Sequence, residues 1–140
     1  IQLINDHLCH VVGDDTDFVT LFACDLNLKE KTLKYVNAGH CPALIKLDRS
    51  RVERLDSYLP ALGFFPLEIE QKTISFSHKV GVFLFTDGFY EWEVEPKKIL
   101  GLDNFLRMAQ SLIIKDAFNL QLLKEGLISC QGFRIHIVTI

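Results

Sequence analysis

Long apolar runs, paired cysteines and an excess of basic residues are all missing from this sequence. Its longest apolar stretches, at residues 18–24 and 80–85, are far shorter than the roughly 20 residues that a membrane-spanning helix needs. The four cysteines form no C-x-x-C pair, which disfavours a zinc knuckle or a dense disulfide framework. The formal net charge of -3 provides no basic surface for nucleic acid or anionic lipid. These absences predict a soluble, cytoplasmic protein with reduced thiols.

The chain does contain enough apolar material for a core. Of its 140 residues, 49% are hydrophobic, which suits one domain. No internal repeat or long linker divides it. Because the sequence starts at Ile1 with residues that already have a helical period, we expect residues 1–140 to be a single partial domain, incomplete at its N-terminus.

The first part of the chain predicts a helix and two strands. Residues 1–12 place apolar side chains at steps of three and four, the period of an amphipathic helix: Ile1, Ile4, Leu8, Val11 and Val12. Residues 18–24 are rich in β-branched and aromatic side chains, which predicts an interior strand covered on both faces. Residues 32–36 follow a polar turn, so the two strands should pair antiparallel.

The rest of the chain predicts more strands and then two helices. The strands are expected in a meander at residues 43–47, 52–55, 69–76 and 80–85. Helices are expected at residues 103–114, with Asp103 as the N-cap, and at residues 117–127, before a last strand at residues 133–140. Several strands with helices on their flank predict a sandwich of α and β layers.

The segment Thr86-Asp87-Gly88 is the most informative for chemistry. It follows an apolar strand directly, and junctions of this kind are often where ligands bind. Asp87 provides the hard oxygen ligand that Mg²⁺ or Mn²⁺ prefers, and Gly88 lets the backbone approach a ligand closely. The alternative is a plain turn, because Asp-Gly is among the commonest turn signals.

Four blocks together make the sequence similar to a known family. They are Phe18-Val19-Thr20-Leu21-Phe22, then Tyr35-Val36-Asn37-Ala38-Gly39-His40 with Pro42, then Leu62-Gly63, then Phe85-Thr86-Asp87-Gly88 with Glu91. In this order and spacing the chain resembles the SpoIIE-type serine phosphatases, a bacterial branch of the protein phosphatase 2C-like, metal-dependent phosphatases. The similarity extends over residues 1–111.

The resemblance implies an α/β sandwich of mainly antiparallel sheets flanked by helices. In that family, aspartates hold two divalent ions, Mn²⁺ or Mg²⁺, which acidify a water that attacks phosphoserine or phosphothreonine. Asp87, with Gly88 beside it, matches a metal aspartate of the family. Glu91, His40 and Asn37 are candidates to support the metal ligands through hydrogen bonds. The alternative for His40 is a structural role in the turn. The alternative for Glu91 is a position on a solvated acidic face.

The chain departs from the family pattern in two places. The family's first metal motif would precede Ile1, and the acids before its final strand are replaced here by Phe133 and Arg134. A divalent ion needs several oxygen ligands, which Asp87 alone cannot provide. We therefore expect these 140 residues to bind metal poorly and to lack phosphatase activity. Arg134 is expected to pair with Asp87 in place of the ion.

Three functions are therefore open. The first is a SpoIIE-type protein serine/threonine phosphatase domain that acts on a phosphorylated anti-sigma-factor antagonist of the STAS type. The second is a degenerate module that binds or regulates without catalysis in a sigma-factor partner switch. The third is a structural oligomerisation module. A homodimer is also expected, because missing leading strands would leave sheet edges unpaired.

Overall fold

The computed structural model describes residues 1–12, 18–47, 50–77, 79–91 and 93–114. The elements within these ranges are α1 (Gln2–Val12), β1 (Leu21–Asn27), β2 (Thr32–Ala38), β3 (Ala43–Lys46), β4 (Val52–Leu55), β5 (Lys72–Ser75), β6 (Gly81–Phe83), the 3-10 helix η1 (Asp87–Phe89), β7 (Glu93–Glu95), β8 (Lys98–Ile99) and α2 (Leu102–Ile114). No helix in the described ranges is long and apolar enough to cross a membrane. The helix expected at residues 117–127 and the strand expected at residues 133–140 lie outside them.

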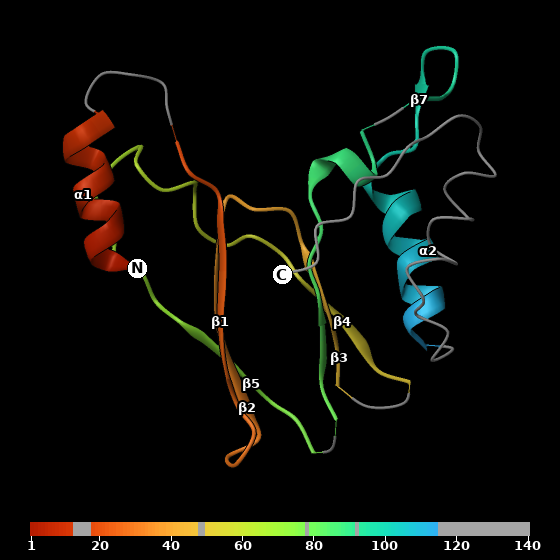
Figure 1. The fold of residues 1–140 in the computed structure, drawn as a ribbon, viewed down its shortest axis with the longest axis horizontal. Helices are drawn as coiled ribbons and strands as arrows, with labels where there is room; N and C mark the ends of the chain where they lie inside the picture. Colours follow the sequence, from red (N-terminus) through yellow and green to blue (C-terminus); the bar gives the residue numbers. More distant parts are fainter. Residues whose placement is uncertain (13–17, 48–49, 78, 92, 115–140) are drawn as a thin grey trace.

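The described elements form four layers, which Figure 1 shows side by side. Helix α1 lies against a first sheet of order β1-β2-β5, and a second sheet of order β4-β3-β6 lies between this sheet and α2. Neighbouring strands in both sheets are antiparallel. The expected α+β architecture of antiparallel sheets and flanking helices is confirmed.

The side chains of β2 and β3 pack between the layers on both sides of each strand, because successive side chains of a strand point to opposite faces. Leu33 and Tyr35 of β2 pack with Ile45 of β3 in the core between the sheets. Val36 of β2 belongs to the cluster that Ile1 and Leu8 of α1 cover. Leu44 of β3 packs with Phe105 of α2 on the other side. Each central strand therefore contributes to two cores.

Helix α1 confirms the predicted helix but not its predicted buried face. Ile4 and Val11 are 54% and 66% exposed, while the polar Asn5 is fully buried. The Asn5 amide donates to the Phe65 carbonyl at 3.3 Å, and its oxygen accepts from the Gly63 N–H at 3.1 Å. These hydrogen bonds fix the side of α1 that faces inward, which periodicity alone does not show.

Strand β1 differs from the interior strand that we predicted for residues 18–24. It begins at Leu21, and Val19 before it makes only an isolated bridge to Leu62. Within the described part of the chain β1 pairs with β2 alone, so it lies at the edge of the first sheet. Its side chains are half-buried or exposed. Among the described residues β1 therefore lacks the second neighbour that we predicted, because an apolar run does not reveal how many neighbours a strand has.

The strand order also differs from the predicted meander. The hairpins β1–β2 and β3–β4 pair as expected, but β5 returns to β2 and β6 returns to β3. The chain therefore alternates between the sheets. Strands β5 and β6 are shorter than the predicted 69–76 and 80–85, and the short hairpin β7–β8 was not predicted.

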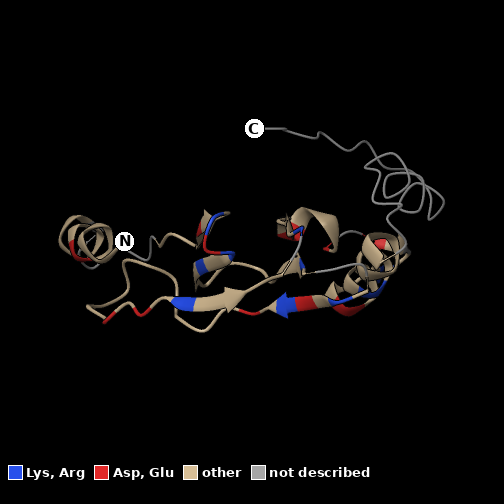
Figure 2. Ribbon diagram, turned by 90° about the horizontal axis from the view of Figure 1, so that it is seen from below, with Lys and Arg blue, Asp and Glu red and all other residues tan. Residues whose placement is uncertain are grey.

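The start of α2 corrects the predicted N-cap. The first helical N–H bond runs from Phe105 to the Gly101 carbonyl at 3.2 Å, so Asp103 lies inside the first turn. Its carboxylate lies 3.7 Å from the Arg54 guanidinium of β4, an exposed pair that contributes little to stability. Strand β4 has the sequence Val-Glu-Arg-Leu and so contains both an acidic and a basic residue. Figure 2 marks acidic residues red and basic residues blue along the ribbon.

Candidate functional site

The candidate site lies where the turn after β2 meets the segment after β6. Strands β3 and β6 are antiparallel with Leu44 opposite Phe83, so the residues before β3 and those after β6 emerge at the same end of the second sheet. Cys41 lies just before β3, and its thiol donates to the Phe85 carbonyl at 3.1 Å. The Asn-Ala-Gly-His and Thr-Asp-Gly motifs are thereby brought together.

Asn37 organises the first of these segments from inside the protein. Its side chain is fully buried, and its amide donates to the Leu55 carbonyl at 3.2 Å and the Cys41 carbonyl at 3.4 Å. Its oxygen accepts from the His40 N–H at 3.2 Å. Asn37 therefore closes the turn and attaches it to the end of β4, and its polar atoms are engaged with backbone groups.

Gly39 allows this turn to lie directly on the neighbouring loop. It has φ +66°, and a Cβ at this position would lie 2.8 Å from the Cα, Cβ and backbone nitrogen of Ala61. The Gly39 N–H also donates to the Leu59 carbonyl at 2.9 Å. Only glycine combines this backbone conformation with so close an approach.

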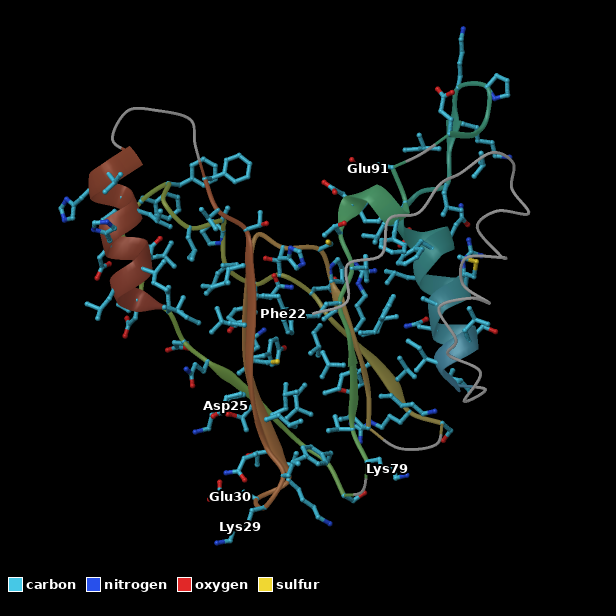
Figure 3. The ribbon with its side chains drawn as sticks, viewed as in Figure 1. Phe22, Asp25, Lys29, Glu30, Lys79 and Glu91 are labelled. Atoms are coloured by element: carbon cyan, nitrogen blue, oxygen red, sulfur yellow. The ribbon has the colours of Figure 1, made fainter. Side chains whose placement is uncertain are left out.

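The second segment turns sharply after a buried aromatic residue. Phe85 is 4% exposed and packs edge-on against Phe105 of α2, with ring centroids 4.8 Å apart. Asp87 then begins η1; its carboxylate is exposed and accepts from the Gly88 N–H at 2.9 Å. The Glu91 N–H donates to the Asp87 carbonyl at 3.0 Å, so Glu91 follows Asp87 by one helical turn. Figure 3 labels Glu91 at this end of the molecule.

Asp87 and Gly88 differ from the sequence expectation in detail. Strand β6 ends at Phe83, so Asp87 lies beyond the strand at the start of η1 rather than at the strand end itself. Gly88 is not among the glycines with positive φ, and a Cβ there would meet only the Thr86 hydroxyl at 3.9 Å. The turn that surrounds Asp87 does not itself require glycine.

Cys41 and Tyr90 belong to the site, and sequence reasoning missed both roles. Burial raises the pKa of the Cys41 thiol above its ordinary value of 9.0, and the charges of Asp87 and Glu91 raise it further. Burial also raises the pKa of Tyr90, with Cys41 as its next contributor. The thiol therefore stays protonated near neutral pH and acts as a donor, not as a nucleophile. No local sequence pattern predicts the contact between Cys41 and Phe85, which are 44 positions apart.

The described residues do not by themselves fit a divalent-metal centre. Within the ranges that the structure covers, no three His, Cys, Asp or Glu side chains converge closely enough to hold an ion. Asp87 and Glu91 lie on one exposed turn, His40 has a ring nitrogen 4.0 Å from the Cys41 sulfur, and Asn37 is committed to backbone partners. Phe133 and Arg134 lie outside the described residues, so the expected Arg134–Asp87 pair stays a prediction.

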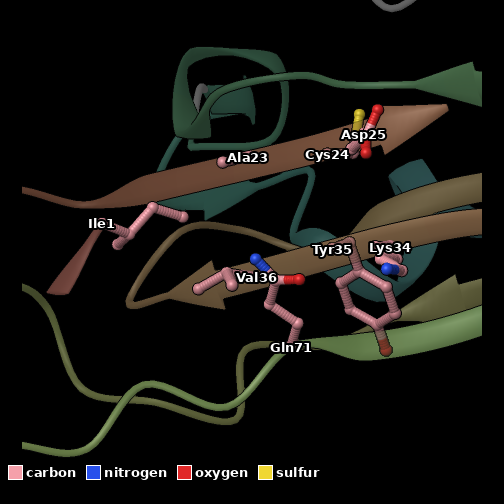
Figure 4. Close-up of a pocket in the computed structure, with 8 residues that line it drawn as sticks. All are labelled: Ile1, Ala23, Cys24, Asp25, Lys34, Tyr35, Val36 and Gln71. Carbon is pink, nitrogen blue, oxygen red and sulfur yellow. The ribbon is translucent and has the colours of Figure 1, made fainter.

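A separate open pocket of about 180 Å³ lies on the first sheet, as Figure 4 shows. It is lined by Ile1, Ala23, Cys24, Asp25, Lys34, Tyr35, Val36 and Gln71. None of the candidate site residues contributes to it. The pocket is therefore distinct from the meeting point of the two motifs.

Comparisons with known proteins agree with the motifs. The family model described as Stage II sporulation protein E (SpoIIE) matches residues 1–129. The chain is 36% identical to Protein IcfG of Synechocystis over 66 residues, which are 47% of this chain and 10% of that protein. It is 28% identical to Phosphoserine phosphatase RsbP of Bacillus subtilis over 89 residues, 61% of this chain and 22% of that protein. The aligned regions thus span less than a quarter of either relative. No solved structure matches the chain significantly.

Proposed function

The chain belongs to the SpoIIE family, and from this premise we propose that it forms part of a domain that removes phosphate from phosphoserine or phosphothreonine of another protein. The observation that carries the proposal is the hydrogen bond between the Cys41 thiol and the Phe85 carbonyl. It brings together the Asn-Ala-Gly-His and Thr-Asp-Gly motifs, two of the blocks on which the family resemblance rests. The name of the relative RsbP, a phosphoserine phosphatase, supports the same reaction class. The substrate we propose is a small phosphorylated anti-sigma-factor antagonist of the STAS type.

Within this proposal Asp87 is one metal ligand of the family's Mn²⁺ or Mg²⁺ site, and it is not sufficient alone. Its carboxylate is exposed, and among the described residues it accepts a hydrogen bond from the adjacent Gly88 N–H. The described donor set does not fit two ions, because a divalent cation needs several oxygen ligands and charge neutralisation. We therefore propose that these 140 residues lack phosphatase activity.

A non-catalytic regulatory module is the second candidate. It is favoured by Phe133 and Arg134, which stand where the family pattern has acids. An arginine near Asp87 would replace the charge of a metal ion with that of a side chain. Such a module would keep the surface that recognises the phosphoprotein without turning it over.

Activity and metal binding test the proposal together. The chain is assayed for hydrolysis of p-nitrophenyl phosphate with Mn²⁺, and Mn²⁺ binding is measured by calorimetry. We expect no hydrolysis above background and no tight two-ion isotherm. The matched variants are Asp87→Asn and Asp103→Asn, since both aspartates are exposed at the start of a helical segment. Mn²⁺-dependent turnover that Asp87→Asn abolishes and Asp103→Asn preserves would refute the predicted inactivity and establish a working phosphatase.

Recognition of the phosphoprotein is common to both candidates and is tested by binding. The probe is a STAS-type protein, prepared with and without phosphate on its serine, and its affinity for this chain is measured by calorimetry. Preference for the phosphorylated form supports a role in recognising the phosphoprotein. Equal or absent binding of both forms contradicts it.

A further inference from the structure

Two polar side chains are fully buried among the described residues: Asn5 and Asn37. Asn37 closes the turn of the candidate site, whereas Asn5 lies on α1, outside both motifs. The Asn5 oxygen accepts from the Gly63 N–H at 3.1 Å, and its nitrogen donates to the Phe65 carbonyl at 3.3 Å. Losing either bond would leave a buried polar group without a partner, which is costly. Asn5 therefore fixes residues 63–65 against α1.

The segment that Asn5 holds also supports the turn of the Asn-Ala-Gly-His motif. Ala61 lies two positions before Gly63, and a Cβ added to Gly39 would lie 2.8 Å from the Ala61 backbone. The Gly39 N–H also donates to the Leu59 carbonyl at 2.9 Å. Closely packed contacts transmit displacement, because they leave no void to absorb it. A shift of Gly63 should therefore also move Gly39.

The turn at Gly39 decides where the next two residues lie. The Cys41 thiol donates to the Phe85 carbonyl at 3.1 Å, and a His40 ring nitrogen lies 4.0 Å from the Cys41 sulfur. Asp87 follows Phe85 by two positions. The position of the turn therefore sets how His40 and Cys41 lie relative to Asp87.

We propose that Asn5 is a positioning residue of the candidate site. Its carboxamide holds residues 63–65, and this hold keeps Ala61 against Gly39. The turn at Gly39 then presents His40 and Cys41 to the Asp87 segment. The importance of this placement for phosphate removal rests on the proposed function. The placement itself is tested without metal or substrate, so either proposal can fail while the other stands.

A second anchor explains why the bonds of Asn5 are needed. Leu62 pairs with Val19 through two backbone hydrogen bonds of 2.8 and 3.0 Å, which hold the same segment from the residues before β1. One pair of parallel bonds fixes a distance and leaves rotation about the paired backbone possible. The bonds of Asn5 come from α1, on another side, and remove this rotation.

Gln2 provides a matched control on the same helix. It lies three positions before Asn5, and its carboxamide makes the same pair of bonds, accepting from the Ile69 N–H at 3.1 Å and donating to the Leu67 carbonyl at 2.8 Å. These bonds lie further along the loop, beyond the segment that supports Gly39. Asn5→Ala and Gln2→Ala therefore remove equivalent bonds, of which only those of Asn5 act on the candidate site.

Alkylation of Cys41 measures the position of the turn. Iodoacetamide is added to the folded chain at pH 8, and labelling of each cysteine is followed by peptide mass. We expect Cys41 to react about tenfold faster in Asn5→Ala than in the native chain, and at the native rate in Gln2→Ala. Cys24 is exposed, so it reports reagent access and should react equally in all three proteins. Equal labelling of Cys41 in all three overturns the proposal.

The same measurement separates positioning from plain stabilisation. If Asn5 only stabilises the fold, the added labelling of Cys41 equals the unfolded fraction multiplied by the labelling rate of the unfolded chain. Urea unfolding of Asn5→Ala gives this fraction. We expect labelling faster than the product, because the turn moves while the chain stays folded. Agreement with the product overturns the proposal.

A double-mutant cycle tests the link between Asn5 and Gly39. In the native chain Gly39→Ala forces a Cβ against Ala61. In the Asn5→Ala background the segment that contains Ala61 can move away, so Gly39→Ala should raise the unfolding equilibrium constant about fivefold less. Gly101→Ala adds a Cβ with nothing within 4 Å, and it should have the same effect in both backgrounds. Additive effects of Asn5→Ala and Gly39→Ala overturn the proposal.

Hydrogen exchange tests the native chain without any substitution, and it applies even if Asn5→Ala fails to fold. The Gly63 amide is bonded to Asn5, and the Gly39 amide is bonded to Leu59. If Asn5 holds both segments in place, the two amides open together, and their protection factors should agree within about fivefold. A larger difference between Gly63 and Gly39 overturns the proposal.

Discussion

Replacing Gly39 with alanine tests whether the turn after β2 lies as tightly against its neighbour as the structure shows. The added Cβ would lie 2.8 Å from three atoms of Ala61, closer than Cβ atoms approach other atoms in proteins. Two of these atoms are backbone and the third is a Cβ, so no flexible side chain can move aside. The alanine would also have to keep φ near +66°.

Both effects have known magnitudes. A non-glycine residue in the left-handed region costs about 1–2 kcal/mol. Forcing an extra carbon into a packed contact costs about 1–3 kcal/mol. Gly39→Ala should therefore lower the free energy of unfolding by about 2–5 kcal/mol, a large fraction of the roughly 5–15 kcal/mol typical of a domain.

Gly101→Ala is the matched control. Gly101 has a comparable φ of +79°, but nothing lies within 4 Å of the Cβ that would be added. Only the cost of a non-glycine residue at positive φ remains, so the unfolding free energy of this variant should fall by about 1–2 kcal/mol. The difference between the two variants isolates the contact with Ala61.

Urea unfolding followed by far-UV circular dichroism measures both variants. The slope of the unfolding free energy against urea concentration should be the same in both variants and the native protein, since the substitutions change stability and not the surface exposed on unfolding. If Gly39→Ala loses no more stability than Gly101→Ala, the close approach of the turn to Ala61 is refuted, and with it the placement of the Asn-Ala-Gly-His motif.

Two further residues of the site give predictions. Asn37→Ala removes the partner of three backbone groups and should lower the unfolding free energy by about 2–4 kcal/mol in urea; a loss below about 1 kcal/mol would contradict its role in closing the turn. The raised pKa of Cys41 means that the native state favours the protonated thiol, so its contribution to stability is complete below the ordinary value of 9.0 and decreases as pH rises above it. Cys41→Ser should therefore lose less unfolding free energy than the native protein as pH rises from 8 to 10, measured by urea unfolding at each pH. An equal decrease of unfolding free energy with pH in both proteins would contradict this assignment. In the native protein, iodoacetamide should modify Cys41 at pH 8 more slowly than after unfolding, and equal rates would argue against its burial.

Local pattern was sufficient for the elements whose signal lies within a few residues. The period of residues 1–12 predicted α1, and the polar turn before Thr32 predicted the β1–β2 hairpin. The helix predicted at residues 103–114 is α2, although its expected cap was not at Asp103. The layered arrangement followed from strands with helices at their flanks. These predictions depend on side-chain periodicity, which the backbone imposes wherever the element lies in the fold.

Features that depend on neighbours could not be predicted in this way. Residues 18–24 have the composition of a buried strand, yet in the described part of the chain β1 pairs only with β2, whose other side is taken by β5. Helix α1 buries Asn5 and exposes Ile4, because backbone groups of a distant loop satisfy the amide. Burial here is decided by hydrogen-bond partners that no local window contains.

The candidate site also combines features that local sequence predicts with features that distant neighbours determine. The motif around Asp87 predicted a turn and a candidate ligand, but the position of Asp87 in the protein is set by β3. With Leu44 opposite Phe83, the antiparallel register continues toward Cys41 and Phe85, and the thiol–carbonyl bond joins the two strands just beyond their regular ends. Moving β3 by one residue would reverse its faces, turning Leu44 away from α2, and would carry Cys41 away from Phe85. The core that fixes this register, with Leu44 against Phe105 on one face and Ile45 against the first sheet on the other, therefore also fixes where the Asp87 carboxylate is presented.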